Sequence, residues 1–117
     1  MSQVIELPFP PSTNTYWRMV NNRMLISKRG RDYKTTVAGI LYGCKPLSGR
    51  IKLTVLLHAP DKRRRDIDNF GGKALLDALG YAGAYEDDSQ VDILHIVRGE
   101  VIKGGMVKVV IEEIADV

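Results

Sequence analysis

The feature that most constrains the fold is an alternating stretch at residues 50–58. Aliphatic side chains occupy every second position, and a lysine and a threonine separate the first three of them. Side chains of a β-strand point alternately to the two faces of a sheet, so this period of two predicts a strand with one buried face. The aliphatic positions are Ile51, Leu53, Val55 and Leu57.

Weaker patterns predict the other elements. The 117 residues are enough for one domain with one core, so we expect a single α+β domain over residues 1–117, with a mixed β-sheet packed against two α-helices. Ser27 is expected to cap the first helix, whose buried stripe is predicted at Tyr33, Val37, Ile40 and Leu41. Strands are expected at residues 4–7, 91–98 and 106–114, a hairpin at 19–26, and helices at 28–42 and 69–79.

One strand interpretation and one helix interpretation are specific enough to be tested. Residues 91–98 are predicted to place Val91, Ile93, His95 and Val97 on one face. In the second helix, Gly71-Gly72 is unfavourable, because each glycine costs about 1 kcal/mol in a helix interior. Phe70 is also out of phase with Leu75. We therefore expect Asp68 or Asn69 to cap this helix and a π-bulge to absorb one extra residue.

Charge is distributed unevenly. The net charge is +3, but residues 1–85 hold fourteen Lys or Arg against six Asp or Glu, whereas residues 86–117 hold three against eight. A basic body is typical of a protein that binds a polyanion such as DNA. No apolar run approaches the roughly 20 residues of a membrane span, and the lone Cys44 has no partner for a disulfide. We expect a cytoplasmic protein that does not bind a membrane.

The central stretch, residues 62–69, suggests the chemistry. Four cations run directly into Asp66 and Asp68. In an extended segment these two carboxylates point to one side while Ile67 anchors the other, and a hard divalent cation such as Mg²⁺ would relieve their repulsion. The adjacent cations suit phosphate. The alternative is a solvated basic face followed by an aspartate that caps a helix.

A second acidic cluster, Glu86-Asp87-Asp88, precedes the strand at residues 91–98. If that strand lies beside the strand at 50–58, we expect Asp66, Asp68 and one of Asp87 or Asp88 to converge on a metal. Lys73 could stabilise developing negative charge. The alternative is that the acidic cluster only forms ion pairs with residues 63–65.

These motifs, taken in order, resemble those of the RusA family of Holliday-junction resolvases, and the likeness covers nearly the whole chain. The family's opening proline-rich loop is similar to residues 7–14, followed by Tyr16 and Arg18. Its central signature is similar to residues 64–69 with Lys73 and residues 76–79. Its third motif is similar to residues 86–91, and Lys103-Gly104-Gly105 also matches.

The resemblance implies a Mg²⁺-dependent, homodimeric endonuclease that nicks two opposed strands of a four-way DNA junction and needs no organic cofactor. Asp66, Asp68 and Asp88 would be catalytic and metal-binding, with Asp87 beside them, and Lys73 would be the catalytic lysine. Phosphate contacts are expected from Lys62, Arg63, Arg64 and Arg65, and also from Arg18, Lys28 and Arg31.

One departure from the family pattern concerns the active-site turn. Three residues separate Asn69 from Lys73 where the family has two, and one extra residue rotates a side chain by about 100° on an ideal helix. The proposed bulge would restore the position of Lys73; without it, Arg64 or Arg65 could substitute. The glycine pair favours one alternative, a junction-binding module with impaired catalysis. A less selective Mg²⁺-dependent nuclease that acts on branched DNA is a separate alternative.

Overall fold

The computed structural model describes residues 2–114, apart from the side chains of Ser2 and Asp68. In this part of the chain, no helix is long and apolar enough to cross a lipid bilayer. The elements are, in chain order, β1 (Ser2–Leu7), α1 (Thr13–Tyr16), β2 (Trp17–Val20), β3 (Arg23–Ile26), α2 (Lys28–Ile40), β4 (Ile51–His58), the 3₁₀ turn η1 (Ile67–Asn69), α3 (Gly72–Tyr81), the 3₁₀ turn η2 (Asp88–Gln90), β5 (Val91–Arg98) and β6 (Met106–Glu113).

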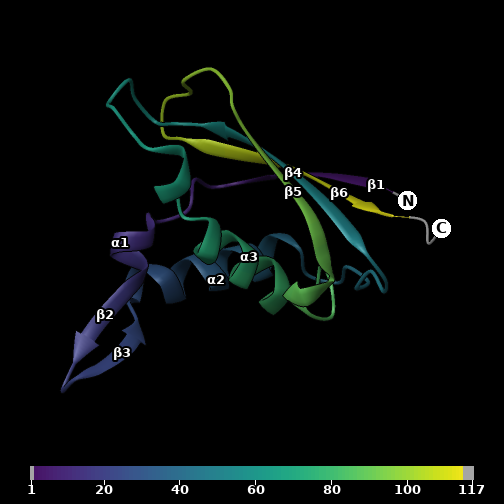
Figure 1. Ribbon diagram of the computed structural model, residues 1–117, viewed down its shortest axis with the longest axis horizontal. Coiled ribbons are helices and arrows are strands. Elements are labelled where there is room, and N and C mark those ends of the chain that lie inside the picture. Colours follow the sequence, from purple (N-terminus) through teal and green to yellow (C-terminus); the bar gives the residue numbers. More distant parts are fainter. Residues whose placement is uncertain (1, 115–117) are drawn as a thin grey trace.

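The main sheet has four strands in the order β1-β6-β4-β5. β6 pairs antiparallel with both β1 and β4, whereas β5 pairs parallel with β4. The two longer helices, α2 and α3, lie together on one side of this sheet, and the β2–β3 hairpin projects away from it (Figure 1). The mixed sheet with helices on one face confirms the predicted α+β class.

The core lies between β4, β6 and the two longer helices. The predicted alternation of β4 is confirmed, because its four aliphatic residues at odd positions are all buried, and β6 contributes Val107, Val109 and Ile111 in the same way. Burying an aliphatic side chain of this size stabilises a fold by about 1.5–3 kcal/mol. These alternating strands therefore provide a rigid platform for the loops at their ends.

Helix α2 begins where the sequence predicts. The Ser27 hydroxyl accepts a hydrogen bond from the Gly30 N–H at 3.2 Å, which satisfies one free donor of the first turn. Tyr33 and Val37 are buried as expected. Ile40 is not: the helix ends there, and its side chain is 48% exposed.

The start of α3 differs from the prediction. Neither Asp68 nor Asn69 caps it, and no π-bulge forms in the described residues of this segment; η1 is followed by Gly71, which takes the N-cap position with φ 104° and ψ 33°. Glycine adopts this left-handed conformation without the steric cost of a Cβ. The extra residue is therefore absorbed by a turn before the helix, and Phe70 is buried in the core at 5% exposure.

The N-terminal loop contains a short helix that the sequence did not predict. Ser12 caps α1, and Tyr16 at its end is completely buried. The ring of Trp17 meets that of Tyr16 edge-on at 5.1 Å. The aromatic pair therefore packs within the fold. The hairpin that follows is also confirmed, with Asn21 and Asn22 both at positive φ in its turn.

Strand β5 has the predicted bounds, Val91–Arg98. It is an edge strand, and every residue of it is exposed or half-buried. Ile93, Leu94 and Val97 are 37%, 40% and 46% exposed. Val91 and Ile96 are half-buried against the core, whereas the described residues leave Ile93 and Val97 largely uncovered, because the core lies over β4 and β6.

Candidate functional site

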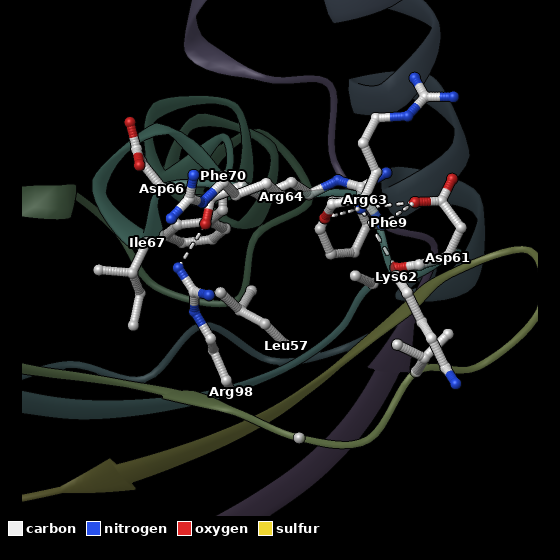
Figure 2. Close-up of a pocket in the computed structure, with 14 residues that line it drawn as sticks. Phe9, Leu57, Asp61, Lys62, Arg63, Arg64, Asp66, Ile67, Phe70 and Arg98 are labelled. Carbon is white, nitrogen blue, oxygen red and sulfur yellow. Dashed lines mark hydrogen bonds and ion pairs between the residues drawn. The ribbon is translucent and has the colours of Figure 1, made fainter.

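The basic stretch forms a loop beyond the C-terminal end of β4, above a pocket of about 320 Å³ (Figure 2). The apolar part of the pocket is made by Phe9, Leu57 and Phe70, and cations surround it. Gly105 explains how Phe9 is held: a Cβ at Gly105 would lie 2.9 Å from the Phe9 Cβ, so only glycine permits this packing. The proline-rich loop and the Lys-Gly-Gly turn thus meet at this pocket.

Two arginines hold the loop in shape. Arg65 donates to the Asp61 carboxylate at 2.8 Å and also to the Arg63 carbonyl oxygen at 3.1 Å. Hydrogen bonds from Arg65, and then from the backbone N–H of Arg63, lower the pKa of the Asp61 carboxyl below its ordinary value. From β5, the Arg98 guanidinium donates to the Arg65 carbonyl oxygen. Arg65 and Arg98 are therefore used within the fold.

Three other cations of the loop remain available. The side chains of Lys62, Arg63 and Arg64 are exposed, and none makes a hydrogen bond or ion pair with the side chains that the structure describes. Free cations at successive positions suit a line of phosphates, since phosphate contacts account for most of the affinity of a protein for DNA. They can also screen an adjacent carboxylate.

Asp66 follows these cations directly. It stands at the N-cap position of η1 with an extended backbone, but its side chain caps nothing, and it is exposed. Figure 2 shows its carboxylate pointing away from Leu57 and Arg98. The predicted strand-like relationship between Asp66 and Asp68 is wrong, because Asp68 lies within a 3₁₀ turn. Ile67 is 41% exposed and does not anchor the segment.

Lys73 lies in the first turn of α3 and forms an ion pair with Asp77 at 3.0 Å. Asp77 also accepts a hydrogen bond from the Tyr16 hydroxyl at 2.6 Å. Burial, and then the bond to Asp77, raise the pKa of Tyr16 above its ordinary value. Asp77 thus connects the predicted catalytic lysine to the N-terminal helix. This aspartate was not predicted from the sequence, although its position four residues after Lys73 on a helix was a usable signal.

The second acidic cluster forms a tightly bonded turn at η2. The Asp87 carboxylate accepts from the Ser89 N–H at 3.0 Å, and bonds from Ser89 lower the pKa of Asp87. The Gln90 side chain accepts from the backbone N–H groups of Glu86 and Asp87 at 2.8 and 2.7 Å. These bonds leave Asp88 exposed, with no hydrogen bond or ion pair to any side chain in the described part of the chain.

The two acidic segments lie at opposite ends of the sheet. β4 and β5 run parallel, with Ile51 opposite Val91 and Leu57 opposite Arg98. Asp66 follows the end of β4, whereas Asp88 precedes the start of β5, and α3 runs between them (Figure 1). Among the described side chains, which do not include Asp68, no three possible metal ligands come together. One chain therefore does not bring Asp66 and Asp88 to the same point.

The suggested ion pairs between the acidic cluster and residues 63–65 are also absent from the described residues: the described ion pair of Arg65 is with Asp61. Of the other predicted DNA contacts, Arg18 is exposed on β2. Lys28 forms an ion pair with Asp32 at 2.8 Å, and Arg31 donates to the Ile26 carbonyl oxygen at the same distance. Arg18 is thus more available for phosphate than Lys28 or Arg31.

The fold and these motifs define the class to which the chain belongs. Residues 8–112 match the family model described as endodeoxyribonuclease RusA, and the chain is a member of that family. It is 40% identical over 114 residues to the crossover junction endodeoxyribonuclease rusA of Enterobacteria phage HK97, covering 95% of this chain and 94% of the relative. The corresponding enzyme of Enterobacteria phage 82 is 41% identical over 115 residues, covering 96% and 95%. Crossover junction endodeoxyribonuclease RusA of Escherichia coli (strain K12) is 39% identical over the same length.

Proposed function

We propose that this chain is a Mg²⁺-dependent endodeoxyribonuclease that resolves four-way DNA junctions by paired symmetric nicks. It acts as a homodimer in the cytoplasm and needs no organic cofactor. The proposal is supported by membership of the RusA family and by relatives that are named crossover junction endodeoxyribonucleases. A junction with two-fold symmetry calls for two equivalent sites, and an isologous dimer supplies them.

The observation that carries the proposal is the position of Asp66 beside three free cations. Lys62, Arg63 and Arg64 have no partner among the described side chains, and the Asp66 carboxylate that follows them caps nothing. A phosphodiester needs both kinds of group: cations to hold its charge, and carboxylates to hold a metal against it. A bland basic domain would be expected to pair this aspartate with a neighbouring arginine.

The residues present fit a hard divalent cation. Carboxylate oxygens are the ligands that Mg²⁺ prefers, and the exposed Asp66 and Asp88 carboxylates are free to bind it. Asp66 and Asp68 would hold the metal at the end of β4, and because Asp88 of the same chain lies at the other end of the sheet, Asp88 would join them from the partner subunit of the proposed homodimer. Asp87 would steady the turn that carries Asp88. When bound, Mg²⁺ would lower the pKa of a water ligand and neutralise charge on the phosphate.

Lys73 would stabilise the negative charge that develops on the phosphate or on the leaving oxygen. Its ion pair with Asp77 fixes the direction of the ammonium group. The loop cations, with Arg65, Arg18, Lys28 and Arg31 as further predicted contacts, would position the DNA backbone without reading its sequence. The chain's own part in the reaction is therefore to bind phosphate, orient it and hold the charge.

A cleavage assay on a synthetic four-way junction tests this function. Wild type should make paired symmetric nicks only when Mg²⁺ is present, and should cut a flap or plain duplex much more slowly. Asp68→Asn should bind the junction in a gel shift without metal, but should not cut it. Glu113→Gln, which removes one exposed negative charge at the end of β6, is the matched control and should cut like wild type.

Two outcomes would replace the proposal. Binding of the junction without any nick in Mg²⁺ would make the chain a junction-binding module with impaired catalysis. Equal cutting of junction, flap and duplex would make it a less selective nuclease.

A further inference from the structure

The pocket drawn in Figure 2 has no part in the metal chemistry proposed above. Its volume of about 320 Å³ lies within the range of pockets that take small ligands. Apolar side chains, among them Phe9, Leu57 and Phe70, form its wall, and charge surrounds them: five of the described lining residues are cationic and two are acidic. An occupant that complements both parts has an apolar body with negative charge attached to it.

Phe9 presents the accessible aromatic surface of this pocket. It packs against the core but is half-buried, whereas Phe70 and Leu57 are only 5% and 6% exposed. The close contact with Gly105 fixes the position of the Phe9 side chain. In Figure 2, Phe9 lies near Asp61 and Phe70 near Asp66, at opposite ends of the pocket. A fixed and partly exposed ring is suited to stacking with a flat ligand.

A second hollow adjoins the first. It has a volume of about 380 Å³, and five residues line both hollows: Phe9, Arg64, Arg65, Asp66 and Phe70. The other described residues that line the second hollow, Ser12 and Asn69, are polar. The segment at residues 64–66 therefore borders an apolar hollow and a polar one. A single nucleotide can place its phosphate in the polar hollow and its base in the apolar one.

We propose that the apolar pocket binds one unpaired base of the DNA junction, stacked on Phe9, from a nucleotide whose phosphate lies beside Asp66. This inference rests on the proposed function, because the DNA substrate supplies the base. Taking a base out of the duplex costs least where its pairing is already interrupted, as at the crossover of a four-way junction. The pocket thus favours branched DNA over plain duplex.

Arg98 provides donors for the edge of such a base. It lines the pocket, and its described hydrogen bond to the Arg65 carbonyl oxygen uses one of the five N–H groups of a guanidinium. Nucleobases carry carbonyl and ring-nitrogen acceptors along their edges. Lys62, Arg63 and Arg64, which are exposed, hold the flanking phosphates. An aromatic face, edge donors and surrounding cations together fit a base on its phosphodiester chain.

An abasic scan combined with Phe9→Leu tests the pocket, because leucine keeps apolar bulk but removes the flat ring. Four-way junctions with one abasic site, placed at successive positions around the crossover, are bound in gel shifts without metal. At one position, wild type should lose affinity by roughly 5- to 140-fold, as expected for one base stacked on an aromatic side chain. Phe9→Leu should bind the intact junction at least about 5-fold more weakly than wild type, but the same abasic site should cost this variant little more.

The interaction between the two changes separates stacking from a general loss of structure. If Phe9→Leu weakens binding equally for the intact junction and for every abasic junction, Phe9 supports only the fold, and the pocket assignment is overturned. Tyr42→Leu is the matched control, because it removes an exposed aromatic ring just after α2. It should show the wild-type pattern across the scan.

Fluorescence gives a readout that does not depend on affinity. The adenine analogue 2-aminopurine is placed at the position that the scan identifies, and the junction is saturated with protein. Wild type and Tyr42→Leu should protect this base from quenching by acrylamide, whereas Phe9→Leu should leave it accessible. Equal quenching in the wild-type and Phe9→Leu complexes would contradict the pocket assignment.

Nicking of the intact junction by wild type in Mg²⁺ is measured separately. If wild type nicks the junction but Phe9 shows no coupling to any base, the pocket assignment alone is wrong. If wild type binds the junction but never nicks it, the proposed function is wrong, and the abasic scan still decides whether the pocket holds a base. A wild-type protein that does not bind the junction at all would overturn both.

Discussion

Gly71 lies directly against Pro11: a Cβ at Gly71 would be 2.1 Å from the Pro11 carbonyl oxygen. Gly71 joins η1, which contains Asp68, to the start of α3, and Pro11 belongs to the loop before α1. The contact therefore fastens the turn that carries the candidate metal ligands to the N-terminal loop. This close packing against Pro11 constrains residue 71 in addition to its left-handed backbone conformation.

Gly71→Ala should destabilise the protein more than Gly83→Ala does. Both glycines have positive φ, at 104° and 86°, so both substitutions cost about 1–2 kcal/mol from backbone strain. Only Gly71 is close to backbone atoms, which adds about 1–3 kcal/mol of overpacking, because Gly83 has nothing within 4 Å of a Cβ. Urea unfolding measures the difference, and equal losses for the two variants would show that the Pro11 contact is not tight.

Tyr16→Phe should lower the free energy of unfolding by about 1.5–3 kcal/mol, because it removes a buried hydroxyl that donates to the charged Asp77. Tyr42→Phe is the control: Tyr42 is 92% exposed, and its substitution should change stability little. Chemical denaturation of both variants checks this. A Tyr16→Phe protein as stable as wild type would mean that water replaces the missing donor at Asp77.

Stability should fall as the pH rises above about 10. Burial raises the pKa of Tyr16, Tyr33 and Tyr85 above the ordinary tyrosine value of 10.0. In that range the unfolded chain loses protons that the folded chain keeps, so deprotonation favours unfolding, and the full contribution is present below pH 10. Urea midpoints at pH 8, 9.5 and 10.5 measure the trend, and Tyr33→Phe should reduce its slope. A midpoint independent of pH across this range would contradict the prediction.

The loop cations should set the salt dependence of DNA binding. Arg63→Ala/Arg64→Ala should weaken binding of a four-way junction and reduce the slope of log K against log salt by about two, one for each phosphate that is no longer neutralised. Lys45→Ala, an exposed cation away from this loop, should leave the slope near the wild-type value. Gel shifts at several salt concentrations without metal provide the slopes. A slope unchanged in the double variant would place the DNA elsewhere.

The sequence predicted the local features of this fold well. The alternation of β4, the Ser27 cap and the Asn21-Asn22 turn depend on neighbouring residues, and the structure confirms each of them. The break at Gly71 was not predictable in the same way, because its cause is Pro11, sixty positions earlier. Helix propensity already disfavoured the glycine pair, and the contact with Pro11 fixes where α3 begins.

For the candidate site, the sequence proposes a set of residues but does not reveal their geometry. Alternation reveals a strand without revealing its direction, so the parallel pairing of β4 with β5, which separates Asp66 from Asp88, was invisible in the pattern. The same limit applies to the exposure of the apolar residues of β5, which depends on strand order, because β5 is at the edge of the sheet. Asp77 was missed because its importance comes from Tyr16, on a distant helix.

The parallel pairing of β4 and β5 also bears on how unwanted DNA cleavage by this protein could be avoided. With its acidic residues divided between the two ends of the sheet, a lone protomer has exposed loop cations beside Asp66 but only part of the proposed metal site. Newly made or dilute chains would hold DNA without damaging it. If the proposed homodimer completes the metal site, cutting would begin only once enough copies had accumulated to pair, so the concentration of the protein would itself limit cleavage.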